Sequence, residues 1–78
     1  MKHVAIDSEA IDSLGYDLDA GVLEVRFHGG RLYRYRQVPP AAVLELLEAE
    51  SIGQHFNQVF KAAGYPYEAL DEGGPPSG

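Results

Sequence analysis

The stretch "VLEVRFHGGRLYRYRQVPP", residues 22–40, constrains the fold most strongly, because two alternating runs flank a pair of glycines. Alternation with a period of two is typical of half-buried β-strands, and glycines between two such runs indicate a hairpin. Neighbouring side chains in a strand point to opposite faces, so a slip of one residue would turn every side chain over. The length of the loop therefore decides which residues are buried.

Parity separates the possible loops. If the two glycines alone formed the loop, the ring of Phe27 would share its face with Arg34 and Arg36. A loop of three or five residues instead places Phe27 on the same face as Tyr33 and Tyr35. Rings pack in a core far more readily than guanidinium groups do. We therefore predict an odd loop, with three residues and a glycine bulge as the favoured form.

This register predicts two chemically different faces. The inner face carries the apolar and aromatic residues Leu14, Tyr16, Leu23, Val25, Phe27, Tyr33 and Tyr35. The outer face carries Glu24, Arg26, Leu32, Arg34 and Arg36. A sheet with one wet face is an ordinary antiparallel arrangement, so the arginines are expected to face solvent.

The remaining strand signals are weaker. Leu14, Tyr16 and Leu18 alternate with polar or small residues and predict the first strand, after an extended lead-in over residues 1–10. The two prolines at 39 and 40 end the sheet, because proline donates no ladder hydrogen bond. The later segment "YPYEAL" either adds a short edge strand or packs on the sheet.

Two helices are predicted after the prolines. The first spans residues 40–50, with an apolar stripe made of Val43, Leu44, Leu46 and Leu47. The second spans residues 52–63, where Ile52, Phe56, Val59, Phe60 and Ala63 form one stripe. Ser51 and Gln54 match a capping box at its start, and Gly64 ends it. The predicted class is α+β: a three-stranded antiparallel meander with two helices packed on one face.

Length and composition bound the rest. Seventy-eight residues predict one domain over residues 1–70, followed by a disordered acidic tail rich in glycine and proline at 71–78. The chain has no cysteine and no apolar run of the roughly 18 residues that cross a membrane. We expect a cytoplasmic protein with no membrane partner.

The charge is unevenly distributed. Twelve acidic residues against six lysines and arginines give a net charge of −6, which disfavours unspecific binding of phosphate chains. Four of the cations nevertheless fall within eleven residues, from Arg26 to Arg36. A local basic surface is therefore compatible with an acidic chain.

Several short motifs together resemble a known family, the KTSC domain. They are Gly15-Tyr16-Asp17, Tyr33-Arg34-Tyr35, Val38-Pro39, the set Ala49, Ser51, Gly53, Phe56 and Asn57, and the final Tyr65-Pro66-Tyr67. The resemblance covers about residues 4–70. Ser8-Glu9 replaces a pair of serines that is common in the family, and Ile52 stands at a position where lysine is common. The family is named for the C-terminus of some lysyl-tRNA synthetases and also occurs alone in small bacterial proteins, so the resemblance implies RNA binding.

The predicted ligand is RNA or single-stranded nucleic acid. The candidate phosphate-binding residues are Arg26, Arg31, Arg34, Arg36 and Lys61, with Tyr33, Tyr35, His55 and Asn57 as further binding candidates. Two plainer interpretations stay open. The tyrosines are expected to pack in the core, and the arginines can be an exposed face in which Glu24 pairs with Arg34 or Arg36. The first turn of the second helix could hold an anion, but capping is favoured there.

Nothing in the sequence predicts catalysis, a metal or a cofactor. His3, His28 and His55 lack ligand spacing, and no nucleophile, base and orienting group fall in order. We expect a non-enzymatic binding module. The alternative to a nucleic-acid ligand is a protein partner that binds an exposed sheet edge. The actual ligand, the oligomeric state and the biological process are left open.

Overall fold

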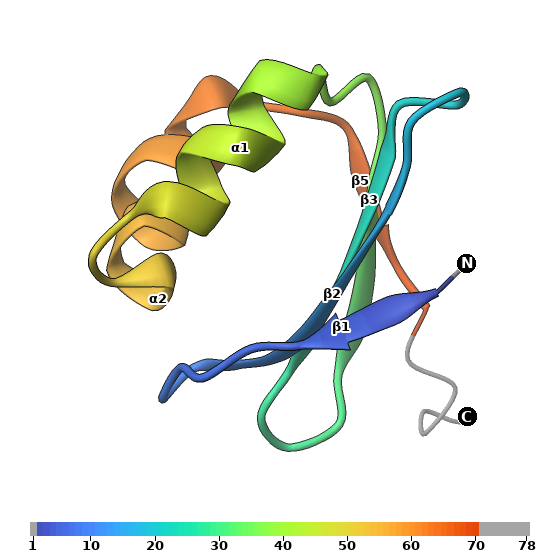
Figure 1. Cartoon of the computed structure of the whole chain (residues 1–78). Coiled ribbons are helices and arrows are strands. Elements are labelled where there is room, and N and C mark those ends of the chain that lie inside the picture. The colour runs from blue at the N-terminus through green and yellow to red at the C-terminus, as the bar shows by residue number, and fades with distance from the viewer. Residues whose placement is uncertain (1, 71–78) are drawn as a thin grey trace.

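The fold has two layers, a sheet and a set of helices on one of its faces (Figure 1). The structure, a computed structural model, describes residues 2–70. The tail predicted at 71–78 lies outside the described residues. The predicted class, α+β with an antiparallel sheet and helices on one face, is confirmed.

The sheet has five strands, so the prediction of three strands was wrong. They are β1 (His3–Ala5), β2 (Ile11–Asp17), β3 (Val22–Phe27), β4 (Leu32–Tyr35) and β5 (Tyr67–Ala69). Every strand pairs antiparallel with the next one in the chain, in the order β1-β2-β3-β4-β5. The central three strands are the predicted ones, and each edge gains a strand of three residues.

The hairpin between β3 and β4 has the predicted register. Val25 lies opposite Tyr33, and Leu23 lies opposite Tyr35. The Phe27 amide donates to the Arg31 carbonyl at 2.8 Å, which closes a loop of three residues. Gly29 and Gly30 both have positive φ, at 97° and 94°, and glycine adopts that conformation without strain. Tyr33 and Tyr35 therefore share the inner face with Phe27, and the outer face carries Arg34.

The two edge strands, β1 and β5, come from the segments whose strand signals are weakest in the sequence. β1 comes from the segment predicted as an extended lead-in, and its Val4 is 64% exposed, so no core packing marks it as a strand. β5 follows Pro66, whose carbonyl accepts from the Arg36 amide at 2.8 Å. Of the two alternatives left open for "YPYEAL", the structure has the edge strand, because Tyr67 pairs with Tyr35.

The helical layer differs from the prediction in detail. Helix α1 spans Pro40–Glu48 and ends two residues before the predicted position. The second helix is not one α-helix: α2 (Ile52–His55) continues as a π-helix η1 (Phe56–Phe60) and a 3-10 turn η2 (Lys61–Ala63). Ser51 caps the start by accepting from the Gln54 amide at 3.3 Å, and Gly64, at φ 76°, ends the segment.

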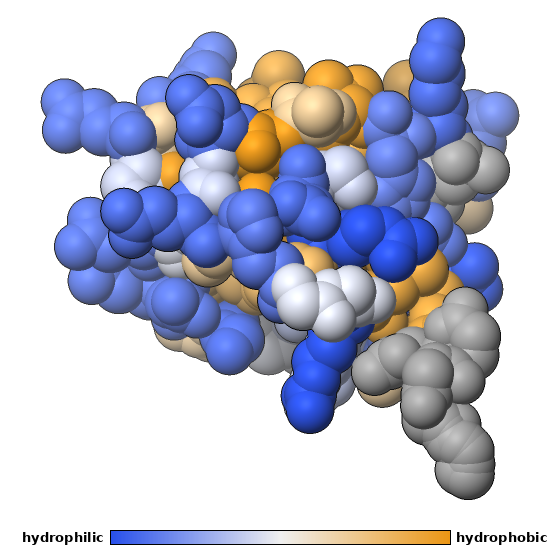
Figure 2. All heavy atoms as spheres, turned by 90° about the horizontal axis from the view of Figure 1, so that it is seen from below, coloured by the Kyte–Doolittle hydropathy of each residue, from blue (hydrophilic) through white to orange (hydrophobic). Residues whose placement is uncertain are grey.

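The core lies between the sheet and the helices. Its buried residues are Ile11, Leu14, Leu23, Val25, Tyr35, Val38, Val43, Leu46, Phe56 and Phe60. Leu18 was predicted on the first strand but lies in the following turn, and Leu44, Leu47 and Val59 are also exposed. So small a core cannot cover every apolar side chain, and hydrophobic surface shows between hydrophilic side chains in Figure 2.

Candidate functional site

A cavity of about 590 Å³ opens on the inner side of the sheet, beside the end of the second helix. We call it the aromatic cavity. Its lining residues are Phe27, Arg31, Tyr33, Tyr35, Phe60, Lys61, Gly64, Tyr65 and Tyr67. Six of these nine residues are aromatic, two are cationic, and none is acidic.

Strand pairing and the end of the helix bring these residues together. Tyr33 and Tyr35 alternate on β4, and the pairing of β5 places Tyr67 directly opposite Tyr35. Gly64 reverses the chain at the end of η2, and the ring of Tyr65 then packs on Phe60 with centroids 4.9 Å apart. The cavity therefore needs residues from both layers.

The deepest lining rings are Tyr35 and Phe60, which are 5% and 3% exposed. Their centroids lie 5.2 Å apart at 85°, an edge-to-face contact that stabilises aromatic clusters. Tyr67 approaches Tyr35 at 5.3 Å and Tyr33 at 5.8 Å, and it is itself 60% exposed. The rings thus run from a buried floor to an open rim.

Burial also affects the ionisation of Tyr35. Desolvation, with smaller contributions from neighbouring Tyr67 and Tyr33, raises the pKa of Tyr35 to about 12. The phenol is therefore neutral over the whole physiological range. A neutral, electron-rich floor accepts a flat ring or a cation equally well, so the charges at the rim decide what binds.

Arg31 and Lys61 supply the positive charge at this site. Arg31 lies immediately before β4 and lines the cavity, and Lys61 begins η2. Neither forms an ion pair with another residue in the range 2–70. Two cations without a nearby acid are notable in a chain with a net charge of −6. The cavity can therefore attract an anion that also carries a flat ring.

The π-turn explains why Lys61 is found here. A regular α-helix would put Lys61 on the same face as Asn57, four residues earlier. In η1 the Lys61 amide instead bonds the Phe56 carbonyl, five residues back. The wider turn moves Lys61 to the aromatic cavity, whereas Asn57 lines a different hollow and His55 lines neither. The structure therefore does not bring Lys61, His55 and Asn57 to one hollow.

The hollow that Asn57 lines lies between the β1–β2 loop and the start of the second helix. Its volume is about 830 Å³, and it includes Asp7, Glu9 and Glu50 but no lysine or arginine. Three acids repel an anion. Gly53 lets the helix approach this loop, because a Cβ there would lie 3.3 Å from Ala10 Cβ and from Ser8 Oγ.

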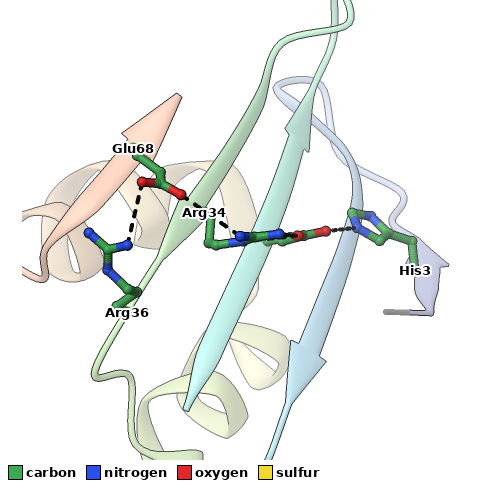
Figure 3. Close-up of polar contacts among 5 residues, drawn as sticks. His3, Arg34, Arg36 and Glu68 are labelled. Atoms are coloured by element: carbon green, nitrogen blue, oxygen red, sulfur yellow. Dashed lines mark hydrogen bonds and ion pairs between the residues drawn. The ribbon is translucent and has the colours of Figure 1, made fainter. Parts of the chain in front are cut away.

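The outer face holds most of the remaining arginine charge in ion pairs. We call His3, Glu24, Arg34, Arg36 and Glu68 the ion row. Glu24 accepts two bonds from Arg34, at 2.9 and 3.2 Å, and one from His3 at 2.9 Å. Glu68 lies 3.8 Å from Arg34 and 3.4 Å from Arg36. Figure 3 shows His3, Arg34, Arg36 and Glu68 arranged across the sheet.

The strand register builds this row. His3, Gly15, Glu24, Arg34 and Glu68 are successive partners across the five strands. Gly15 leaves the space that the His3 ring occupies, because a Cβ at this position would lie 2.8 Å from His3 Cδ2. The ring therefore reaches over β2 and bonds Glu24.

Glu24 is the one charged side chain of the described residues that is buried, at 8% exposure. Desolvation alone would raise its pKa, but hydrogen bonds from His3 and Arg34 and the charge of Arg34 outweigh it, so the pKa of Glu24 is lowered. It remains an anion at neutral pH. Of the outer arginines, Arg34 and Arg36 are thus bound to acids, and Arg26 contacts the Gly30 carbonyl at 3.4 Å.

The sequence-based candidates therefore separate into groups. Arg31, Lys61, Tyr33 and Tyr35 meet at the aromatic cavity, whereas Arg26, Arg34 and Arg36 lie on the opposite face. Sequence reasoning missed four lining rings, Phe27, Phe60, Tyr65 and Tyr67, as parts of a site. The one available signal was the high aromatic content of the segments 27–35 and 56–67, which reads equally well as core.

Within residues 2–70, no three histidine, aspartate or glutamate side chains gather closely enough to hold a metal ion. No helix in the same range has the length and apolar character needed to cross a membrane.

Comparisons with known proteins place this chain in a family. An uncharacterized protein of Stutzerimonas stutzeri is 55% identical over 71 residues, which cover 91% of this chain and 100% of the relative. A lysine–tRNA ligase of Nostoc punctiforme is 34% identical over 64 residues, which are 82% of this chain but 11% of the ligase.

A solved structure and a family model agree with these matches. The crystal structure of a KTSC domain protein from Yersinia pestis superposes with a TM-score of 0.80 and 31% identity, over 88% of this chain and 96% of that one. The KTSC domain model matches residues 7–65, which include all of β2, β3, β4 and both helices. This chain therefore belongs to the KTSC domain family.

Proposed function

We propose that this chain is a non-catalytic module that binds single-stranded nucleic acid, RNA foremost, in the aromatic cavity. The observation that carries the proposal is that Arg31 and Lys61 line the cavity together with six aromatic residues and no acidic residue. Stacking of a base on an aromatic side chain contributes about 1–3 kcal/mol and tolerates any base. Arginine and lysine beside such rings are positioned to contact phosphate.

The outer arginines contribute less in this proposal. Arg34 and Arg36 already bind Glu24 and Glu68, so a phosphate would have to displace a carboxylate to reach them. The inner cavity demands no such exchange. The name of one relative, a lysine–tRNA ligase, adds an RNA context.

The test is a fluorescence-anisotropy titration of a short single-stranded RNA at several salt concentrations. We expect micromolar affinity at low salt. Two neutralised phosphates predict a slope of log K against log salt of about −1.4, because each contributes about −0.7 on a single strand. A slope of about −2.8 would instead indicate that four cations take part.

Two arginines beside the same hairpin provide a matched pair of variants. Arg31 faces the cavity, and Arg26 lies on the outer face without an acidic partner in the described residues. Arg31→Gln is expected to weaken binding and Arg26→Gln to leave it nearly unchanged. The opposite ranking would move the site to the outer face, and an absence of binding at low salt would reject the proposal.

The alternative is a protein-interaction module that acts through a sheet edge. It is favoured by β1, an edge strand of three residues whose Val4 is largely exposed. A protein partner could extend the sheet there by strand addition. A pull-down from lysate treated with nuclease separates the two functions. A specific partner that survives the nuclease and is lost in a Val4→Pro variant supports this alternative.

A further inference from the structure

We propose that the aromatic cavity is a site for a single nucleotide: one unpaired base together with its own phosphate. This inference rests on the proposed function and makes it narrower. A protein with such a site captures a single exposed or terminal nucleotide and does not bind along a run of nucleotides.

The size of the cavity is the first argument. At about 590 Å³ it falls in the range of about 300–1,000 Å³ that is usual for small-molecule pockets. Surfaces that bind runs of nucleotides instead spread stacking rings along a groove, with site sizes of about 4–16 nucleotides. Here the rings gather around one opening. Tyr33, Tyr35 and Tyr67 lie within 6.4 Å of one another by centroid, and Tyr65 packs on Phe60.

The second argument is the kind of polar group present. The lining residues include no asparagine, glutamine, aspartate or glutamate, which are the side chains that usually read the edges of adenine and cytosine. Arginine and lysine usually read guanine, but Arg31 and Lys61 are assigned here to the phosphate. Recognition then depends on the flat face of the base and on charge. The site is expected to accept any base, with purines ahead of pyrimidines because their stacking surface is larger.

The third argument is the charge at the rim. Arg31 and Lys61 come from different layers of the fold and line the same opening. A terminal phosphate monoester carries nearly two negative charges at neutral pH, which matches two cations better than the single charge of a phosphodiester. A nucleoside monophosphate should thus bind better than the corresponding nucleoside. A base-paired nucleotide cannot insert its face between the rings.

The test is a titration with adenosine monophosphate, followed by amide chemical shifts of the ¹⁵N-labelled full chain. We expect saturable shifts at Lys61, Gly64 and Tyr67, and at least about fivefold weaker binding of adenosine. The probes need no RNA, so the result is independent of the strand-binding measurement. Inorganic phosphate is the second comparison and should bind more weakly than the nucleotide, because it cannot stack.

Variants at Tyr67 separate stacking from folding, because this residue is 60% exposed. Tyr67→Ala should weaken nucleotide binding about tenfold, in line with the loss of one stack. Tyr67→Phe keeps the ring and should bind as the unchanged chain does. Leu44→Ala, an exposed position on α1, controls for unspecific effects.

The outcomes distinguish the two proposals. If single-stranded RNA binds and adenosine monophosphate leaves these amides unmoved, the single-nucleotide site is rejected while the strand-binding function stands. If neither binds, both are rejected. Equal affinity for adenosine and its monophosphate would also overturn the inference, because the two cations would then play no part.

Discussion

The two faces of the sheet differ in the residues that surround their cations. On the outer face, Arg34 and Arg36 bind Glu24 and Glu68 within the ion row. On the inner face, Arg31 stands with Lys61 among aromatic rings and no lining residue is acidic. Arg34 belongs to β4, and Arg31 stands only three residues earlier, immediately before that strand. The neighbours of each arginine, and not the number of arginines, therefore decide which charge is available to a ligand.

The largest expected effect tests whether the inner face holds the fold together. Phe56 is 1% exposed and contacts the rings of Phe27, Tyr35 and Phe60. Phe56→Ala should lower the free energy of unfolding by about 3–5 kcal/mol, because it leaves a cavity in a small core. Urea denaturation measures this loss. Val59→Ala, at an exposed position of the same segment, should change stability by less than about 0.5 kcal/mol.

The second prediction compares the two arginines directly. Arg34→Gln removes two hydrogen bonds to Glu24 and leaves a buried carboxylate with His3 alone. It should cost about 1.5–3 kcal/mol of folding free energy, the usual range for bonds to charged groups. Arg31→Gln should stay within about 0.5 kcal/mol. Equal losses in urea denaturation would show that the two faces do not differ as described.

The third prediction concerns acid pH. The folded pKa of Glu24 lies below its ordinary value of 4.5. Its contribution to stability is therefore fully present above that value and is lost as the pH falls through the folded pKa. Glu24→Gln should cost about 1–2 kcal/mol at neutral pH and progressively less in acid. A stability difference that stays constant from neutral to acid pH would contradict the assignment.

A smaller effect is expected at Gly15. A Cβ there would lie 2.8 Å from His3 Cδ2, so Gly15→Ala should displace the ring and break its bond to Glu24, at a cost of about 1 kcal/mol. A double-mutant cycle with His3→Ala isolates this term, because only the tight approach to the Lys2 carbonyl oxygen, at 3.1 Å, remains once the ring is absent, so the glycine substitution should cost less. An unchanged cost in the His3→Ala background would place its origin elsewhere.

The smallest effect at neutral pH is expected at Tyr35. Within residues 2–70 its hydroxyl makes no hydrogen bond, so Tyr35→Phe should change stability by less than about 0.5 kcal/mol. The folded pKa of about 12 exceeds the ordinary 10.0. Stability is thus complete below pH 10 and falls as the pH rises toward the folded pKa. The variant should resist alkaline unfolding better, which circular dichroism across this range would detect.

Sequence reasoning succeeded where local chemistry decides the structure. The parity of residues 22–36 predicted the register of β3 and β4, because only one register buries Tyr35 beside Leu23 and Val25. Sequence reasoning failed for β1, because its apolar residue Val4 is exposed and the segment has no buried apolar face that would mark it as a strand. Strand pairing and the polar contacts of His3 hold that segment, and contacts between distant segments leave no periodic trace in a sequence.

The site was harder to predict than the fold. Tyr33 and Tyr35 were expected either to pack in the core or to stack on a ligand. Tyr35 is buried in the core, and both tyrosines line the cavity. The approach of Lys61 depends on the π-turn at Phe56–Phe60, a rare geometry with no residue signature. The pairing of Arg36 with Glu68 required β5, which the sequence left as one of two alternatives.

One short strand joins the two faces. Tyr67 and Glu68 are neighbours on β5, so the first side chain forms part of the cavity wall while the second lies between two arginines. A contact that fixes the position of β5 affects both the cavity and the ion row, and such a coupling between two sites is reciprocal. Occupancy of the cavity should strengthen the carboxylate's hold on the arginines. Conversely, neutralising Glu68 should loosen a bound nucleotide although that carboxylate never touches it.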